Sequence, residues 1–242
     1  MEREVQTRTK EIQTKLATKS TIQALNEVFA SNSWDQDTQW VAVNLIREYF
    51  GSYLDTLPHQ FFAYLIEAER LYYILTTERG FNDGLPIISV LTKAYDCLIH
   101  EIITKSFVKY ARDRLRWEVP PKFNDPLERA LIAMVTKIYT LSIGRITPLL
   151  SRIRDHRENG VTLLPYTQIF ADWIEWNESL EKNLLSEPLR KKLVRLNESE
   201  IFGEKRHRSS INHDEVREVR SLLLGNYENQ QSIFMLLVKI GK

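Results

Sequence analysis

The residues best suited to chemistry are concentrated in one polar stretch, EKRHRSSINHDE at 204–215. It combines cations, imidazoles, hydroxyls and an amide: Lys205, Arg206, His207, Arg208, Ser209, Ser210, Asn212 and His213. An arginine and a histidine held together can cleave a phosphodiester without a metal ion. The guanidinium binds the phosphate, while the imidazole moves a proton at neutral pH. The hydroxyls and the amide could orient the phosphate or the ring, so this stretch is the candidate site.

The spacing within the stretch leaves open which arginine acts with the histidine. On a straight helix of about 100° per residue, Arg206 and His213 lie within about 20° of one face, whereas Arg208 and His213 diverge by about 140°. Arg208 and His213 converge only if the chain bends or if a helix begins near His213. A helix capped by Asp214 and ended by Gly225 is predicted here.

The rest of the chain is expected to be helical nearly throughout, because the short alternating runs typical of strands are almost absent. Helices are expected at 2–30, about 35–54, 58–77, 85–115, 126–159, 164–185, 186–196, 214–225 and 226–240. The segment 85–115 is apolar on most of its circumference, which predicts a position at the centre of a bundle. Asn124 or Asp125 is expected to cap the helix over 126–159, and Pro148 to kink it.

Composition sets the general class. The chain has 242 residues and a net charge of +1, which gives no overall attraction to nucleic acid or to a membrane. Cys97 is the only cysteine, and neither a signal peptide nor an apolar membrane span is evident. These features predict a cytoplasmic protein without a membrane partner. The expected division is an N-terminal helical arm, 1–55, followed by a helical-bundle domain, 56–242.

The stretch RSSINH has four residues between Arg208 and His213, and RHRSSINH has six between Arg206 and His213. An arginine followed by histidine at this spacing, before a late helix of an all-helical domain, resembles the HEPN superfamily. The segments FFAYLIEAERLYYIL and VLTKAYDCLIHEIITKSF resemble the first two helices of its bundle. The resemblance extends over roughly 57–225. It implies an all-α, up-down helical bundle of HEPN-like type, here with the additional arm.

The resemblance also implies a function. Two copies would dimerise so that their motifs form one composite, metal-independent ribonuclease site that needs no cofactor. His213 would be the acid–base group and Arg208, or Arg206, would bind the phosphate. The remaining polar residues would contact substrate: Lys205, His207, Ser209 and Asn212. Partners would be RNA, a second copy and a protein partner or antitoxin, in a toxin or antiviral-defence system. The family commonly has Asn, Asp or His after the arginine. Ser209 follows Arg208 here, whereas His207 follows Arg206. The identity of the arginine therefore stays open, and so does an inactive RNA-binding relative.

Two further alternatives remain. One is a non-catalytic helical adaptor, or a subunit of a larger complex. The other is a nucleic-acid-binding protein that uses the basic stretch together with the helix segment 190–195. Other polar and aromatic features are interpreted as structural. The carboxylate pairs are expected on solvated helix faces: Glu67 with Glu69, and Glu175 with Glu178. Two pairs of aromatic residues are expected in the core: Tyr72 with Tyr73, and Trp173 with Trp176.

Overall fold

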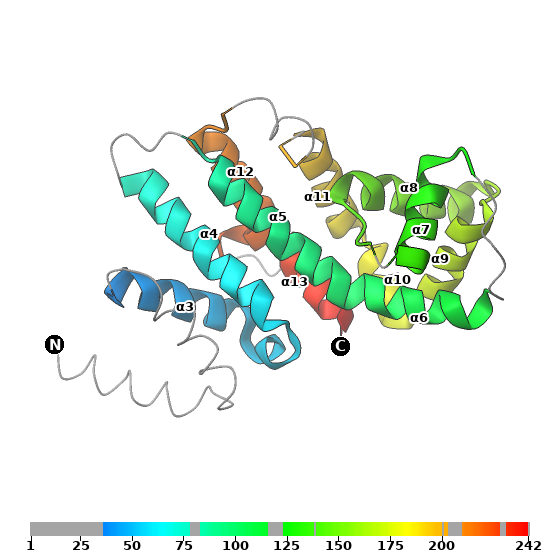
Figure 1. Ribbon diagram of the computed structural model, residues 1–242, viewed down its shortest axis with the longest axis horizontal. Helices are drawn as coiled ribbons and strands as arrows, with labels where there is room; N and C mark the ends of the chain where they lie inside the picture. Colours follow the sequence, from blue (N-terminus) through cyan, green and yellow to red (C-terminus); the bar gives the residue numbers. More distant parts are fainter. Residues whose placement is uncertain are drawn as a thin grey trace.

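The computed structural model describes residues 36–77, 83–115, 123–137, 139–199, 201–202, 210–227 and 231–241 (Figure 1). All regular structure in these ranges is helical, which confirms the all-α prediction. The helices are α3 Gln36–Phe50, η1 Gly51–Thr56, α4 His59–Thr77, α5 Leu85–Ile99, η2 His100–Thr104, α6 Lys105–Arg114, α7 Pro126–Lys137, α8 Ile143–Asn159, α9 Pro165–Glu175, α10 Glu178–Leu184, α11 Glu187–Glu198, α12 His213–Leu224, η4 Gly225–Tyr227, α13 Ile233–Val238 and η5 Lys239–Gly241.

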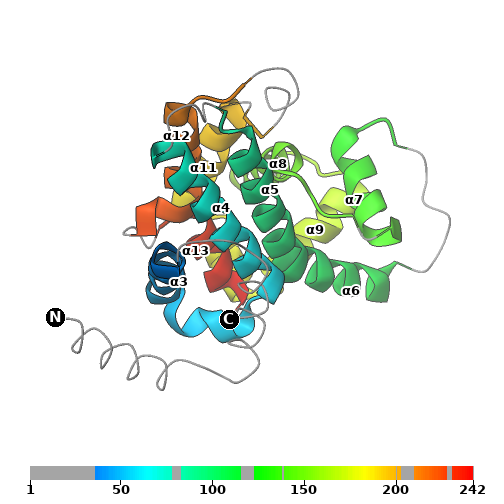
Figure 2. The same ribbon diagram turned by 60° about the vertical axis from the view of Figure 1, so that its left-hand side comes forward.

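The central helix runs from α5, which lies in the middle of the molecule in both views, through the π-helical segment η2 into α6, which extends to one edge (Figures 1 and 2). The predicted central position is confirmed for the α5 part of 85–115. Its first part buries residues around much of its circumference: Ile87, Ile88, Leu91, Ala94, Tyr95, Leu98 and Ile99. Helix α4 packs along α5, and α6 packs against α7 and α9. One long helix therefore joins the two ends of the molecule.

The short helix α13 lies at the centre of the core. All six of its residues are buried, and it contacts α5, α10, α11 and α12. A run of consecutive apolar residues can be buried only where neighbours surround the helix on every side. Helix α13 therefore fills the centre of the bundle, between α5, α10, α11 and α12.

Helix α3 shares this core. Phe50 and Phe61 pack edge to face, as do Phe61 and Phe234 of α13. The hydroxyls of Tyr49 and Ser232 form a buried hydrogen bond. The first 35 residues of the predicted arm lie outside the described residues, so the domain boundary at residue 55 stays a prediction.

Two predicted helices are each split in two. The expected helix over 126–159 is interrupted and forms two helices, α7 and α8. The chain leaves the helical conformation before Ser142. The residues on either side of Ser142, Leu141 and Ile143, are both buried. A continuous helix would be about 50 Å long, whereas the break lets both α7 and α8 contact α9. Asp125 accepts hydrogen bonds from the backbone N–H groups of Leu127 and Glu128, so the prediction of a cap at this residue is confirmed.

The expected helix over 164–185 is α9 and α10. Asn177 separates them, because its extended backbone starts a new helix and its side chain accepts hydrogen bonds from the N–H groups of Ser179, at 2.9 Å, and Leu180, at 3.3 Å. Asparagine is among the favoured N-cap residues. None of the helices in the described part of the chain is both long and apolar enough to cross a membrane.

Candidate functional site

The structure describes only the last part of the candidate stretch, 210–213 and the helix that follows. Five of the predicted site residues lie outside the described residues, and their roles stay predictions: Lys205, Arg206, His207, Arg208 and Ser209. The geometry of the site is therefore built from Asn212, His213 and their surroundings.

Helix α12 begins at His213 and is capped by Asn212, not by Asp214 as predicted. The Asn212 side chain accepts from the N–H of Glu215 at 3.0 Å, and the Glu215 carboxylate accepts from the N–H of Asn212 at 2.9 Å. Asn212 and Glu215 have the spacing of a capping box, and the reciprocal pair favours this start over one at Asp214. The carboxamide oxygen of Asn212 is thus occupied by the helix, and no described residue hydrogen-bonds to its amide nitrogen.

Residues 210–212 are not helical, so the helical spacing that would align Arg206 with His213 does not apply. Instead, the segment is held against the start of α5. The N–H of Ile211 donates to the Asp83 carboxylate at 3.2 Å, and the N–H of Gly84 donates to the Ile211 carbonyl at 2.7 Å. Two hydrogen bonds and the buried Ile211 side chain therefore fix the point at which the candidate stretch joins α12.

The His213 ring stacks on Tyr72 of α4. The ring centroids are 5.9 Å apart and the planes are inclined by 18°. His213 is half-buried, and no described residue hydrogen-bonds to its ring nitrogens. An imidazole that is held by one face, with its nitrogens not committed to a described residue, is suited to accept or donate a proton.

An ion pair lies seven residues further along the same face of α12. The Arg220 guanidinium donates to both oxygens of Glu69, at 2.9 and 2.8 Å, and the Tyr227 hydroxyl donates to the same carboxylate at 3.0 Å. The Arg220 guanidinium also lies 4.7 Å from the Tyr72 ring centre. The side chains of Glu69 and Arg220 are only 10% and 12% exposed, so the prediction of a solvated face is wrong for Glu69.

Burial shapes the electrostatics of this ion pair. Burial alone lowers the pKa of Arg220, but the hydrogen bonds and charge of Glu69 outweigh it and hold that pKa above its ordinary value. Burial and the Glu69 charge raise the pKa of Tyr227 well above its usual range. Arg220 therefore stays charged and Tyr227 stays protonated.

The sequence predictions missed Tyr72, Glu69 and Arg220 as neighbours of the candidate site. A signal for them existed in the helical spacing. Glu69 and Tyr72 are three residues apart on α4, and His213 and Arg220 are seven apart on α12, so each pair lies on one face. The sequence contains nothing to indicate that these two faces meet.

The other aromatic and acidic candidates differ in whether the structure confirms their predicted burial. Trp173 is fully buried and donates to Ser106 at 3.3 Å, which confirms a core position. Trp176 is 71% exposed and Tyr73 is 50% exposed, so the core prediction is wrong for both. The exposed Glu175 accepts from Arg157 at 3.1 Å.

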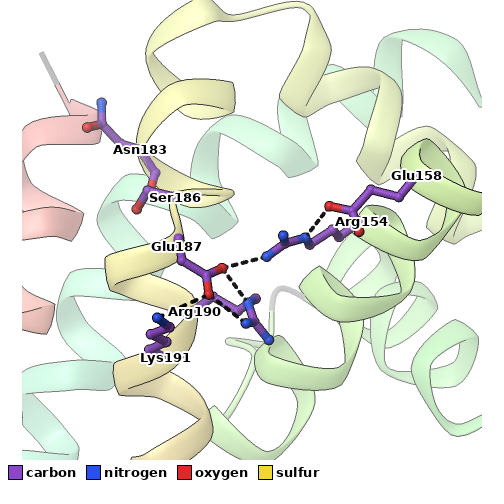
Figure 3. A network of polar contacts seen from close by, with 7 residues as sticks. All are labelled: Arg154, Glu158, Asn183, Ser186, Glu187, Arg190 and Lys191. Carbon is purple, nitrogen blue, oxygen red and sulfur yellow. Dashed lines mark hydrogen bonds and ion pairs between the residues drawn. The ribbon is translucent and has the colours of Figure 1, made fainter.

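The basic helix segment 190–195 belongs to a charge network that links α8 and α11 (Figure 3). Glu187 accepts from Arg154 at 2.5 Å and from Arg190 at 2.8 Å, and it lies 3.6 Å from Lys191. Arg195 pairs with Glu218 of α12 at 2.8 Å. Pairing with carboxylates weakens the attraction of Arg190, Lys191 and Arg195 for phosphate, whereas no described carboxylate pairs with Lys192.

This network predicts a specific pH dependence. Hydrogen bonds from Arg190 and Arg154 lower the pKa of Glu187 to about 2. A carboxylate with a depressed pKa stabilises the fold above its unfolded pKa of about 4.3 and loses that contribution as the pH falls through its folded pKa. We expect the difference in unfolding free energy between wild type and Glu187→Gln to shrink as the pH falls from about 4.5 to about 2. Urea unfolding at several acidic pH values measures it.

The matched control for this prediction is Glu198→Gln, on the same helix, where the carboxylate is exposed. Its effect on the unfolding free energy should be small. An effect of Glu187→Gln that is the same at every acidic pH would contradict the prediction.

Within the described ranges, no three histidine, cysteine or carboxylate side chains converge on a possible metal site. No known family model, curated protein or solved structure matches the chain.

Proposed function

We propose that this protein is a HEPN-like ribonuclease that cleaves RNA without a metal ion and uses His213 as its acid–base group. The position of His213 carries the proposal. It is the first residue of α12, it follows the basic stretch directly in the chain, and Tyr72 holds its half-exposed ring. An imidazole next to a cluster of cations combines proton transfer with phosphate binding.

The phosphate-binding cation would come from the candidate stretch rather than from α12 itself. The two described arginines on this side of α12 are both paired. Arg217, four residues after His213, donates to Asp214 at 2.9 Å, and Arg220 donates two hydrogen bonds to Glu69. Arg206 or Arg208 would therefore bind the phosphate and offset the charge that develops on it. His213 would take a proton from the attacking oxygen or give one to the leaving oxygen.

The resemblance to the HEPN superfamily also implies how the protein would assemble. A second copy would bring its own histidine and arginine to the same cleft, and the protein would act on RNA in a toxin or defence system together with a protein partner or antitoxin. The inactive RNA-binding relative would keep the phosphate contacts and lack the proton transfer.

Cleavage of single-stranded RNA in the presence of EDTA tests the proposal. We expect His213→Ala to lower the cleavage rate by about 100-fold or more, because a general acid or base contributes about that much. His59→Ala is the matched control, since His59 is an exposed histidine at the start of α4. Circular dichroism and thermal melting should be the same for both variants, because His213 is only half-buried.

An unchanged cleavage rate in His213→Ala would contradict the assignment. Separate Arg206→Ala and Arg208→Ala variants distinguish the two arginines, since only the phosphate-binding one should weaken RNA binding. RNA binding without cleavage in the wild type, weakened steeply by salt, would identify the inactive relative.

The non-catalytic adaptor is the second candidate. The large exposed indole of Trp176 favours it, because aromatic side chains of this kind are enriched at protein interfaces. An adaptor would form a stable complex with its partner and would not cleave RNA.

A further inference from the structure

The Tyr72 ring of α4 lies between two polar side chains of α12. Its ring centre is 5.9 Å from that of His213, with the planes inclined by 18°, and 4.7 Å from the guanidinium carbon of Arg220. Seven residues on one face of a helix correspond to a rise of about 10.5 Å, which is close to these two separations together. Tyr72 therefore inserts between the two side chains, with the imidazole on one side of its ring and the guanidinium on the other.

The Arg220 side of this arrangement is fixed. The guanidinium donates two hydrogen bonds to Glu69, which lies about one helical turn before Tyr72 on the same helix. The Tyr227 hydroxyl donates a third hydrogen bond to the same carboxylate. A bidentate pair of arginine and carboxylate has a narrowly defined geometry, and this one is largely buried. Since Tyr72 is also packed against the hydrophobic core, its ring has little freedom to move.

The His213 side depends on Tyr72. His213 is the first residue of α12 and is half-buried, and no described residue hydrogen-bonds to its ring nitrogens. A histidine that transfers a proton is commonly oriented by a third group, usually a hydrogen-bond partner. The stacked Tyr72 ring is the group in the described structure that can take this part. Stacking leaves both nitrogens at the edge of the imidazole, where a substrate can reach them.

We infer that Tyr72 is the positioning residue of the candidate site, and that its ring sets the orientation of the His213 imidazole. The effect on the reaction rests on the proposed ribonuclease, because this orientation matters to the rate only if His213 transfers a proton. The orientation itself can be measured whether or not the protein cleaves RNA. No described residue hydrogen-bonds to the Tyr72 hydroxyl, so the face of the ring supplies the contact.

The kinetics of RNA cleavage in EDTA test the effect on the reaction. Tyr72→Leu should lower kcat by about 10- to 100-fold, because a misplacement of about 1 Å can cost about 100-fold. It should leave KM nearly unchanged, because Tyr72 acts through His213 and not on the RNA. Tyr72→Phe should restore most of the rate, since it keeps the face of the ring. Tyr73→Leu is the matched control, because Tyr73 is 50% exposed and lies about 100° further around α4.

Proton NMR of the histidine rings measures the orientation without reference to cleavage. An aromatic ring shifts the resonances of protons stacked on its face upfield, so the ring protons of His213 should resonate upfield of those of the exposed His59. The His213 signals are those missing from the spectrum of His213→Ala. Tyr72→Leu should move them toward the position of the His59 signals, whereas Tyr72→Phe and Tyr73→Leu should leave them in place.

Three results would overturn the inference. The first is a set of His213 signals at an ordinary position in the wild type, which requires no variant to fold. The second is a folded Tyr72→Leu protein in which the His213 signals stay in place. The third is a Tyr72→Leu protein that keeps its kcat, or that changes only KM, although the signals move. A wild type that does not cleave RNA, but whose upfield His213 signals depend on Tyr72, would instead refute the ribonuclease and support the positioning of the ring.

Discussion

Replacing Gly84 with alanine is expected to destabilise the protein by about 3 kcal/mol, because an added methyl group has no space there. A Cβ at Gly84 would lie 2.0 Å from Cγ2 of Val216 and 3.1 Å from the carbonyl oxygen of Ile211. Val216 is fully buried and β-branched, so its side chain has no alternative rotamer to adopt cheaply. The start of α5 and the segment before α12 would have to separate. Thermal melting should fall by about 6 to 12 °C, at about 2 to 4 °C per kcal/mol for a protein of this size.

Two comparisons make this test specific. Gly144→Ala is the matched control, because a Cβ there would meet only Asn197 at 3.6 Å, an ordinary contact in the first turn of α8. That variant should be neutral or slightly stabilising. A double-mutant cycle with Val216→Ala removes the clashing methyl groups, so Gly84→Ala should cost less in that background. Equal costs in both backgrounds would contradict the proposed clash.

Replacing Glu69 with alanine is expected to cost about 3 to 5 kcal/mol, because it leaves the buried Arg220 charge without its partner. The Tyr227 hydroxyl would lose its acceptor in the same variant. Equilibrium unfolding in urea measures the loss. Since Arg220 and His213 lie on one face of α12, and Glu69 and Tyr72 on one face of α4, the same variant should also loosen the stacking of His213 on Tyr72.

Glu67→Ala is the matched control for this second prediction. Glu67 pairs with Arg70 on the same helix, but both side chains are about a third exposed, and a pair of this kind contributes at most about 1 kcal/mol. Replacing the whole buried pair, Glu69→Leu with Arg220→Met, should cost less than Glu69→Ala alone, because no unpaired charge remains. A double variant as unstable as the sum of its single variants would contradict this account.

Four features could be predicted from the residues alone: the helical class, the central position of the helix that begins at Leu85, a cap at Asn124 or Asp125, and the end of α12 at Gly225. Each of these follows from signals within a few residues: apolar periodicity, a side chain that caps its own helix, or the left-handed backbone of a glycine, with a φ of 61° at Gly225. Such signals act locally, so the chain does not need to be folded to express them.

Long-range packing sets which helix faces meet. The ion pair of Glu69 with Arg220 and the hydrogen bond of Gly84 with Ile211 join residues more than 120 positions apart, and no local pattern specifies such partners. The break between α7 and α8 and the exposure of Trp176 depend in the same way on how neighbouring helices cover the chain. Local propensity selects a helix, whereas long-range packing selects what each side of that helix touches.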